Sequence, residues 1–501
     1  MYNRRYIDER FRKFLTHYDS LAPKFYGLPK VHKPNTPLRP ITSFVKAPTY
    51  SLSKFIAGIL SGLRDDNINV RSAKILKERM SNVPIGPNHR MVSFDAVSLF
   101  TSIPVTLAIE AVKKRWSELY GVRTAIDRDL FFEVLTFCLR KGYCQFEGVT
   151  YSQVEGTAMG SPLSPIIAEI VLDELFGLIK QKFDSNILFA TKYVDDSLFV
   201  IDDSIFNELF NFINEFHDRI SFTYEKEDDN NHSINFLDVT ILRFSDHFMF
   251  KHFHKPTHTG RIIHYNSNQP FKYTFNTCVN LKEYQLSLSD PCLHNEIIKN
   301  FSDNLKKNGY PGNFINKVLN FERYIKHKKP GRIKYFSIPY IGKSSGIIRN
   351  FLQSLDSNIC ISFGRYNTSK ENFFTKIKDK NPLDQNSGVV YSVPCLGCPK
   401  VYVGETSQYL KSRISQHKHD VKSRRTSTAL ACHTLDMGHQ FDFDNVCVVG
   451  REDNGSKRKI LEVINIVKNI ERTVNYKTDT NNLASVYTSI INDNYSITHR
   501  L

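Results

Sequence analysis

Two adjacent aspartates, Asp195 and Asp196, stand between two apolar runs at 187–190 and 198–201. The pattern predicts two strands joined by a tight turn that carries both acids. Neighbouring carboxylates repel each other and cost stability unless cations neutralise them. A pair of Mg²⁺ ions would do so, and a two-metal site of this kind supports in-line transfer of nucleotides.

A third carboxylate is available at Asp95, which ends the apolar, strand-like run 91–95. A two-metal site needs an acid from a second strand, and Asp95 is the candidate. Phe100 follows five residues later. A bulky ring at that spacing could collide with a ribose 2′-OH and select deoxynucleotides, and the alternative is a core phenylalanine.

Basic residues precede the first acid in the proline-rich segment 21–50, where the prolines predict extended, loop-rich chain rather than helix. Lys30 and Arg39 could bind a triphosphate through charge-assisted bonds, and a basic surface loop is the alternative. The stretch 156–165 is a glycine- and proline-marked loop, whose Gly160 and Ser161 are candidates for contact with a base pair. It could equally be a helix start.

The composition points to a polyanionic partner. The chain has 501 residues, enough for about three domains, and its 67 Lys and Arg against 51 Asp and Glu give a net charge of +16. Nine scattered cysteines suit a reducing compartment rather than a disulfide framework. No signal peptide is visible, and no apolar run approaches the roughly 20 residues of a membrane helix, so no membrane partner is expected.

The elements that must position these residues follow from hydrophobic periodicity. Helices are predicted within 51–82, 105–142, 166–179 and 204–217, and strands at 233–242, including Asp238, and at 247–254. The acidic stretch 225–229 is expected to be a solvated loop. The basic run 326–332 is a candidate nuclear-import signal, phosphate contact or solvated loop.

The ordered motifs resemble those of a reverse transcriptase, and their residues are similar to those of Penelope-like retroelements. The resemblance covers about residues 20–260 and rests on LPKVHKP, LRPI, SFDAVSLFTSIP, GTAMGSPLSPI, YVDD, INFLDV and HKPT. It implies that Asp95 and Asp195 bridge two Mg²⁺ ions with support from Asp196. It also implies that Lys30 and Arg39 face the incoming phosphates and that Phe100 is the sugar gate.

A second constellation lies near the C-terminus. Two short β-type segments, 388–391 and 401–404, precede a predicted helix with Arg413 and His417 on one face, and Glu462 stands in a later helical run. A phosphodiesterase needs an activated water, a cation for the phosphate and a carboxylate for a metal. Tyr391 or Tyr402, Arg413 and Glu462 could fill these roles, or all could be structural.

This segment resembles a GIY-YIG endonuclease, with VVY and YVG as its tripeptides. The resemblance implies that Tyr391 and Tyr402 frame the scissile phosphate, that Arg413 stabilises it with His417 as an assistant, and that Glu462 holds one Mg²⁺. Penelope-like elements carry such a nuclease after the polymerase.

Cys395 and Cys398 are spaced as zinc ligands, and His433 and His439 could complete the set, with Cys432 as an alternative ligand. Penelope-like nucleases resemble this Cys-Cys-His-His set. Four protein ligands leave no open position, so the zinc would be structural. The alternative is free thiols and surface histidines.

We therefore expect an α+β fold: a right-hand polymerase with palm, fingers and thumb-like region, plus a small α/β GIY-YIG nuclease domain. The expected boundaries are 1–245 for fingers and palm, 246–365 for the thumb-like region, 366–387 for a linker, 388–475 for the nuclease and 476–501 for a tail. Because the chain starts only a few tens of residues before the first motif, a truncated copy or partial gene model is expected.

The expected function is RNA-directed DNA synthesis coupled to DNA nicking, in which the nicked target primes the copying of RNA. Its partners would be an RNA template, a DNA target or primer and deoxynucleoside triphosphates, with the oligomeric state open. The protein would be made in the cytoplasm and act in the nucleus. The alternatives are an inactive, nucleic-acid-binding remnant and an RNA-dependent RNA polymerase, which Phe100 disfavours.

Overall fold

The computed structural model describes most of the chain, and its fold is mixed α+β. The described residues are 6–16, 19–31, 33–322, 333–365, 368, 373–374, 378–481, 483–484, 487–488 and 491. The basic run 326–332 and parts of the expected linker and tail lie outside them. Among these residues, no helix is both long and apolar enough to cross a membrane.

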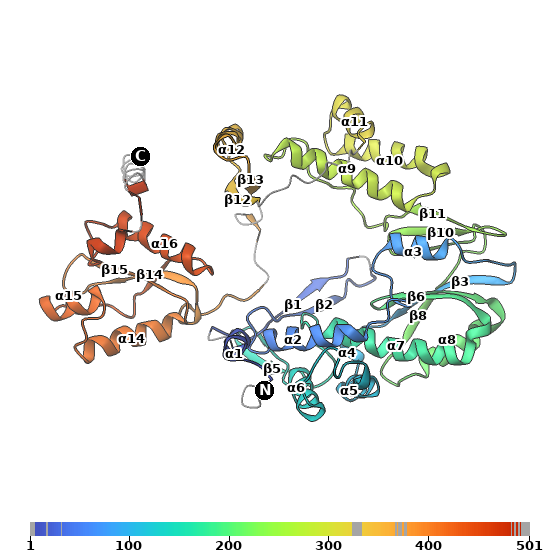
Figure 1. The fold of residues 1–501 in the computed structure, drawn as a ribbon, viewed down its shortest axis with the longest axis horizontal. Coiled ribbons are helices and arrows are strands. Elements are labelled where there is room, and N and C mark those ends of the chain that lie inside the picture. Colours follow the sequence, from blue (N-terminus) through green and yellow to red (C-terminus); the bar gives the residue numbers. More distant parts are fainter. Residues whose placement is uncertain are drawn as a thin grey trace.

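The N-terminal half of the chain contains a four-stranded antiparallel sheet, the central sheet (Figure 1). Its strands, in spatial order, are β6 (Ile187–Tyr193), β7 (Asp196–Asp202), β3 (His89–Ala96) and β8 (Phe222–Lys226). Side chains alternate between its faces. Phe199 and Ile201 enter the larger core, whereas Leu198 and Val200 enter a second core on the opposite face. Burial on both faces explains the continuous apolar run at 198–201.

Helices pack against the first face and contribute to the larger core. They confirm the predicted helical segments, except that the α-helices are interrupted at 61–72 and 115–127. They are α2 (Tyr50–Leu60), α5 (Val105–Lys114), α6 (Arg128–Arg140), α7 (Ser164–Phe183) and α8 (Phe206–Asn214). Two short helices, α1 (Glu9–Leu15) and α4 (Leu99–Ser102), flank this layer. A separate four-stranded sheet, the N-terminal sheet, has the order β2 (Leu38–Ser43), β1 (Lys24–Pro29), β4 (Tyr143–Phe146) and β5 (Val149–Ser152).

The second face of the central sheet is covered by α3 (Ala73–Met80) and a three-stranded sheet. That sheet contains β9 (Ser233–Phe236), β10 (Val239–Arg243) and β11 (Phe248–His252). The prediction of one strand over 233–242 is therefore wrong. Phe236 pairs with Val239 across a two-residue turn in which Leu237 has a φ of 53°. Asp238 lies in this turn. The apolar alternation continues on both sides of it, so periodicity alone could not reveal the break.

The acidic stretch 225–229 is not a wholly solvated loop. Residues 225 and 226 belong to β8, and Glu227 is only 4% exposed. Its carboxylate accepts hydrogen bonds from Arg243 at 2.6 Å, from Arg90 at 2.8 Å and from the backbone N–H of Met91 at 3.2 Å. Two arginines supplied from distant strands therefore offset the cost of burying this charge.

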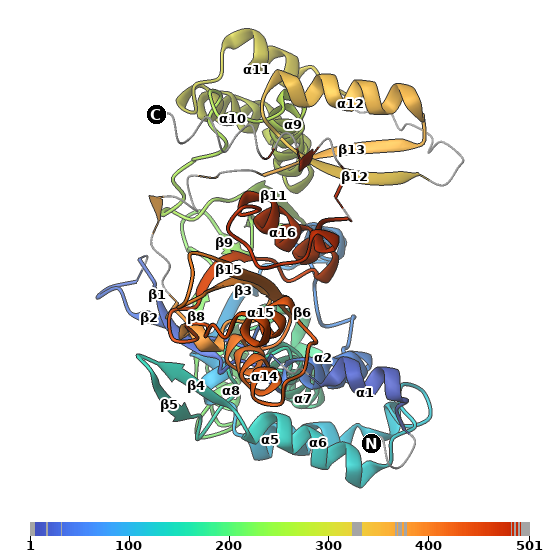
Figure 2. The same cartoon turned by 90° about the vertical axis from the view of Figure 1, so that its left-hand side faces the viewer.

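Beyond β11 come a helical bundle, a small β-α-β unit and a C-terminal α/β unit (Figures 1 and 2). The bundle contains α9 (Phe271–Leu288), α10 (His294–Lys307) and α11 (Gly312–Leu319). The next unit contains β12 (Lys334–Pro339), α12 (Lys343–Leu355) and β13 (Ile359–Gly364), whose strands are parallel.

The C-terminal unit has a three-stranded antiparallel sheet, the C-terminal sheet, of β15 (Val401–Thr406), β14 (Val389–Pro394) and β16 (Cys447–Arg451) in that order. Its helices are α14 (Leu410–Lys422), α15 (Ala429–Met437) and α16 (Gly455–Lys468). The short strands and helices predicted around 388–470 are thus present.

Candidate active site

The central sheet brings the three predicted acids together. Asp95, on β3, pairs in register with Asp196 at the start of β7. Asp195 occupies the β6–β7 turn, and its carbonyl accepts a hydrogen bond from the N–H of Ala96 at 3.2 Å. The preceding Val194 has a φ of 59°, which is a strained conformation for a β-branched residue. Backbone strain of this kind concentrates at functional sites.

Burial and like charges both disfavour the ionised form of the acids in this cluster. Burial raises the pKa of Asp196 to about 6, and the charges of Asp195 and Asp95 add to that shift. Burial also raises the pKa of Asp195, and the charge of Asp95 adds to it. The cluster thus favours a cation, and carboxylate oxygens are the ligands that Mg²⁺ prefers.

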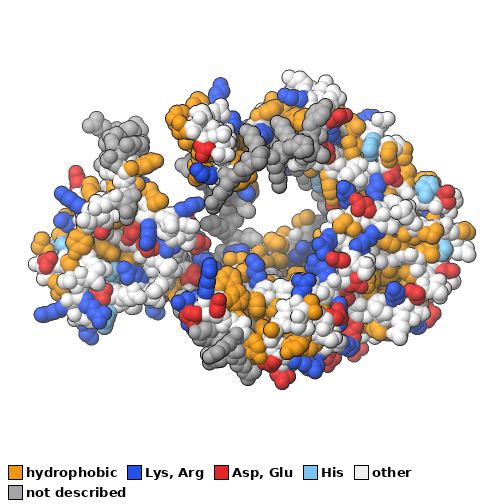
Figure 3. All heavy atoms as spheres, in the orientation of Figure 1, with side chains coloured by type: hydrophobic (Ala, Val, Ile, Leu, Met, Phe, Trp, Pro, Cys, Tyr) orange, Lys and Arg blue, Asp and Glu red, His pale blue; other side chains and the backbone are white. Residues whose placement is uncertain are grey.

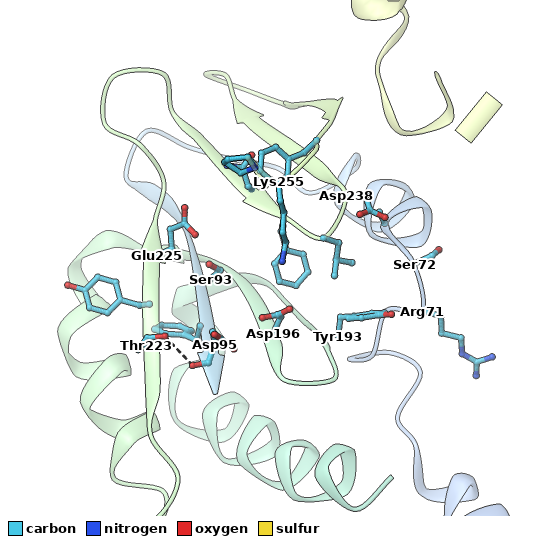
Figure 4. A pocket seen from close by; sticks show the side chains of 18 of the residues that line it. Arg71, Ser72, Ser93, Asp95, Tyr193, Asp196, Thr223, Glu225, Asp238 and Lys255 are labelled. Carbon is cyan, nitrogen blue, oxygen red and sulfur yellow. Dashed lines mark hydrogen bonds between the residues drawn. The ribbon is translucent and has the colours of Figure 1, made fainter. Parts of the chain in front are cut away.

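Basic residues approach the acid cluster from two directions. The charges of Arg39 and Lys30 act on Asp195, whereas the charge of Lys255 acts on Asp196. Asp95 and Asp196 line a cavity of about 880 Å³ that also includes Lys255 and Arg71 (Figure 4). Figure 3 shows an opening beside the N-terminal half of the chain, with Lys and Arg side chains on its rim. A polyanion would find complementary charge here.

Residues 31–239 match the family model described as reverse transcriptase (RNA-dependent DNA polymerase). This match spans the three acids, Arg39, Phe100 and the 156–165 loop. These residues are therefore similar to a reverse transcriptase domain. Members of that family carry out RNA-directed DNA synthesis, generally with Mg²⁺. No curated protein matches the chain.

Several solved polymerases are similar in structure. Telomerase from Candida albicans, in complex with a TWJ fragment of telomeric RNA, is 15% identical in sequence and has a TM-score of 0.43. The match covers 62% of this chain and 57% of the telomerase chain. An apo telomerase from Candida tropicalis, truncated from its C-terminal domain, is 15% identical and has a TM-score of 0.35, and the match covers 46% of this chain and 55% of that telomerase chain. The BmCPV RNA-dependent RNA polymerase at quiescent state is 12% identical and has a TM-score of 0.37, and the match covers 60% of this chain and 27% of that polymerase chain. The chain spans little more than half of the length of these telomerase chains.

The glycine loop 156–165 packs closely against two neighbouring segments. Gly156 and Gly160 have φ values of 76° and 123°, and a Cβ on either would collide with the backbone of Thr101 or Thr42. Ser161 is buried, and its hydroxyl accepts a hydrogen bond from the N–H of Leu163 at 3.3 Å. The loop is therefore fixed by close backbone packing, while its contact with a base pair stays a prediction.

Phe100 lies on α4, where it is partly buried and packs against the larger core. Its carbonyl accepts hydrogen bonds from the N–H of Thr157 at 2.6 Å and from the hydroxyl of Thr157 at 2.9 Å. The expected sugar gate is thus tied to the glycine loop, and its role stays a prediction.

A buried ion pair beside the acid-bearing turn was not predicted. The ammonium of Lys192, a fully buried residue, lies 3.0 Å from the carboxylate of Asp173 on α7 and 2.8 Å from the amide oxygen of Asn69. Such a pair fixes position more than it stabilises the fold. One signal was available, since Lys192 interrupts the apolar pattern of β6 immediately before YVDD.

The C-terminal sheet brings together the second predicted set. Tyr391 on β14 pairs with Gly404 on β15. Tyr402 lies two residues before Gly404 on the same strand, and the ring centroids of Tyr391 and Tyr402 are 6.4 Å apart. The hydroxyl of Tyr391 lies 2.7 Å from Nε2 of His417 on α14. A Cβ on Gly404 would meet the hydroxyl of Tyr391 at 2.8 Å, so this glycine leaves room for the phenol.

Burial governs the charges of this second cluster. It raises the pKa of Tyr402 to about 12 and lowers that of His417 to about 4. It also raises the pKa of Glu462 on α16 to about 7, with the charge of Glu405 as a further cause and that of Arg413 opposing it. Nε of Arg413 and Nδ1 of His417 are buried with no hydrogen-bond partner among the described residues. A bound water or a polar ligand would satisfy these two atoms.

Cys395, Cys398, His433 and His439 converge, with ligand atoms that all lie within 4.8 Å of one another. Nε2 of His433 is 3.5 Å from both sulfurs and 3.2 Å from Nδ1 of His439. A tetrahedral zinc with bonds of about 2.3 Å to sulfur and 2.0–2.1 Å to nitrogen requires ligand separations of roughly 3.3–3.8 Å. The cluster fits that ion.

The alternative ligand Cys432 does not join this cluster. Its thiol points to the carbonyl of Thr426 at 3.8 Å. The helical turn of α15 directs His433 inward and its neighbour elsewhere, because consecutive helical side chains are about 100° apart. Gly397 is required in the Cys395–Cys398 turn, since a Cβ there would meet the ring of His439 at 2.6 Å.

Asn475 is a further residue that sequence reasoning missed. Its side chain accepts from the N–H of Val403 and donates to the carbonyl of Val403, both at 2.9 Å. It thereby holds the strand segment that carries Tyr402. No local pattern could have revealed this, because the two residues are far apart in sequence.

Proposed function

We propose that this protein is a Penelope-type retroelement enzyme, in which an RNA-directed DNA polymerase is joined to a GIY-YIG endonuclease that nicks DNA. The observation that carries the proposal is the convergence of Asp95, Asp195 and Asp196, which lie where β3 ends beside the β6–β7 turn. Fold likeness alone would not support an activity, whereas this acid cluster has the chemistry that nucleotidyl transfer requires.

In the polymerase, the carboxylates of Asp95, Asp195 and Asp196 would hold two Mg²⁺ ions. When bound, the ions supply activation of the primer 3′-OH and charge neutralisation of the leaving pyrophosphate. Arg39 and Lys30 would orient the triphosphate, since they approach the cluster from the N-terminal sheet. Phe100 would exclude a ribose 2′-OH.

In the nuclease, Tyr391 and Tyr402 would position the scissile phosphate and Arg413 would neutralise its developing charge. His417 lies within hydrogen-bond distance of Tyr391 and can accept the phenolic proton. Glu462 would hold one Mg²⁺, and its carboxylate would be ionised by that charge. The chemistry that this metal would supply is polarisation of the scissile phosphate.

Zinc held by Cys395, Cys398, His433 and His439 would join the β14–β15 turn to α15 and its following loop. The polymerase would occupy 1–245 with a thumb-like region at 246–365, and the nuclease would occupy 388–475. The nicked DNA would provide the primer and a bound RNA the template. Chromosomal DNA as the target would place the reaction in the nucleus.

A coupled assay tests the proposal. Wild-type protein, Asp195→Ala and Glu462→Ala are compared in primer extension on an RNA template and in nicking of intact DNA, each with Mg²⁺. Asp195→Ala should abolish extension only, and Glu462→Ala should abolish nicking only. Absence of Mg²⁺-dependent products from the wild type would favour the alternative of an inactive nucleic-acid-binding remnant.

A further inference from the structure

Lys192 lies near the end of β6, three positions before Asp195, and its side chain is fully buried. Its ammonium lies 3.0 Å from the carboxylate of Asp173, and it donates to the amide oxygen of Asn69 at 2.8 Å and to the carbonyl of Glu169 at 3.3 Å. An ammonium has three N–H donors, so every donor of Lys192 has an acceptor here. This side chain therefore has one defined position, unlike a flexible lysine on a protein surface.

The backbone of Lys192 is held as well. Its N–H donates to the carbonyl of Ile68 at 3.0 Å, and its carbonyl accepts from the N–H of Val70 at 3.0 Å. Residues 68–70 thus lie along the outer side of β6, which is the edge strand of the central sheet. On the inner side of β6, Lys192 pairs with Ser197 of β7. Both sides of β6 are therefore paired immediately before the acid-bearing turn.

Two acids of α7 and two arginines form a charge network around this ammonium. Asp173 and Glu169 lie one turn apart on α7, and both are buried. The guanidinium of Arg64 lies 2.6 Å from the carboxylate of Glu169. That of Arg115 lies 3.7 Å from the second carboxylate oxygen of Asp173. Since α7 begins in the glycine loop, the network joins the helix that follows this loop to the strand that leads into the acid-bearing turn.

The acid-bearing turn depends on its surroundings because its backbone is strained. Val194 has a φ of 59°, which is costly for a β-branched residue and persists only where neighbouring structure fixes it. Lys192 holds one end of the turn, and Ser197, whose hydroxyl donates to the carbonyl of Phe94 at 3.1 Å, holds the other. A buried ion pair adds little stability over an apolar pair of similar size. The pair at Lys192 is therefore better explained by position than by stability.

We propose that Lys192 is a positioning residue of the polymerase, whose ion pair with Asp173 fixes the β6–β7 turn in the conformation in which Asp195 and Asp196 bind divalent metal together. This rests on the proposed polymerase function and adds a residue that acts through the turn rather than on the substrate. Productive sites hold their metal ligands to within about 0.5 Å. A looser strand should therefore lower metal affinity and kcat while leaving substrate binding almost unchanged.

The test variant is Lys192→Met/Asp173→Leu, which replaces both members of the pair by apolar residues so that neither charge is left buried alone. The matched control is Glu227→Leu/Arg243→Met, which removes another buried ion pair at the end of β8 away from the acid-bearing turn. Primer extension is measured with the concentrations of primer–template and deoxynucleotide varied separately. Circular dichroism gives the folded fraction of each preparation, and kcat is expressed per folded molecule.

The Lys192→Met/Asp173→Leu variant should lower kcat about 10- to 100-fold, the range expected for residues that orient metal ligands. Both KM values should stay within about twofold of wild type, because no substrate contact is removed. The Glu227→Leu/Arg243→Met control should keep kcat within about twofold, since its pair does not support the turn.

Binding of Mn²⁺ is the second measurement, and it does not depend on turnover. Free Mn²⁺ is followed by electron paramagnetic resonance during a titration of protein that carries Glu462→Gln, so that the proposed nuclease carboxylate does not contribute. Asp195→Asn in the same background is the reference for a lost site. Lys192→Met/Asp173→Leu should weaken the Mn²⁺ binding that Asp195→Asn removes, by about tenfold.

The proposal is overturned if Lys192→Met/Asp173→Leu keeps both kcat and Mn²⁺ affinity within twofold of wild type. It is also overturned if the loss of extension only follows the loss of folded protein, or if the control variant loses kcat to the same extent, because either result would mean a merely structural role. If the wild type never extends a primer, the polymerase function fails, while the Mn²⁺ titration still decides the role of Lys192.

Discussion

The two candidate catalytic clusters manage charge in opposite ways. Asp95, Asp195 and Asp196 form an anionic group that borders a large cavity, and burial, with repulsion from the other two acids, raises the pKa of Asp196 to about 6. The C-terminal cluster buries phenols, an uncharged histidine and one carboxylate around Arg413. The first site is prepared for added cations, whereas the second already contains one cation, the guanidinium of Arg413. One chain can thus carry two sites that respond differently to metal and to mutation.

The largest expected effect is at the acid cluster. Asp195→Asn should lower primer extension about a thousandfold, because it removes a carboxylate that would hold the metal ions acting on the reacting phosphate. DNA nicking should stay within twofold of wild type. Steady-state extension and plasmid-nicking assays on the same preparation measure both. Equal loss of the two activities would mean that the clusters are not independent.

The converse change is Glu462→Gln, which keeps the shape of the side chain. We expect nicking to fall about 10²–10³-fold because the single metal ligand of that site is lost, with extension unaffected. Plasmid nicking against Mg²⁺ concentration measures it. Glu471→Gln, a change outside the cluster, is the control, and a nicking activity retained by Glu462→Gln would remove Glu462 from the site.

Loss of zinc should lower the stability of the C-terminal unit and leave that of the polymerase unchanged. Cys398→Ser should leave one of four ligands missing and destabilise the C-terminal unit by about 3 kcal/mol or more. Calorimetry should show a lowered transition for that unit, with the polymerase transition unchanged, and metal analysis should show lost zinc. Cys432→Ser is the matched control. If both serine variants keep one zinc per chain, the four-residue cluster is not the zinc site.

A smaller effect is expected at the sugar gate. Phe100→Ala should increase the incorporation of ribonucleotides relative to deoxynucleotides about tenfold, since removal of the ring makes room for a 2′-OH. The ratio of kcat/KM for paired nucleotides measures this. Leu99→Ala, in the same helix but in the core, controls for loosened packing. An unchanged ratio would undercut the argument against an RNA-dependent RNA polymerase.

The smallest expected effect is on pH dependence. The pKa of Asp196 is about 6 in the folded protein, above its ordinary value of 3.8. Between these values the folded state holds more protons than the unfolded chain, so metal-free stability should fall as pH rises from about 4 to 6, by about 1 kcal/mol after solvent screening. Denaturation at each pH measures it. Asp196→Asn should flatten this slope, and a slope that persists in the variant would assign it elsewhere.

Sequence patterns predicted the parts of both sites that depend on local order. The turn bearing Asp195 follows from two apolar runs, and the alignment of Asp95 with it follows from antiparallel pairing. The turn at Leu237 was missed, because alternation of apolar residues is the same on both sides of a two-residue hairpin.

Long-range pairing explains the other omissions. Glu227 looked solvated because its partners, Arg90 and Arg243, come from other strands. The Lys192–Asp173 pair joins a strand to a helix, and neither residue signals its partner locally. Cysteine and histidine spacing could indicate a ligand set, but the choice of His433 over Cys432 needed the helical direction of α15.

The central claim is that Asp95, Asp195 and Asp196 jointly hold two divalent ions. Anomalous diffraction from crystals soaked in Mn²⁺ tests it most directly. The account predicts two peaks about 3.5–4 Å apart, with oxygens of Asp95 and Asp195 at both. Crystals that show no peak between these side chains, in the presence of primer–template and nucleotide, would contradict it.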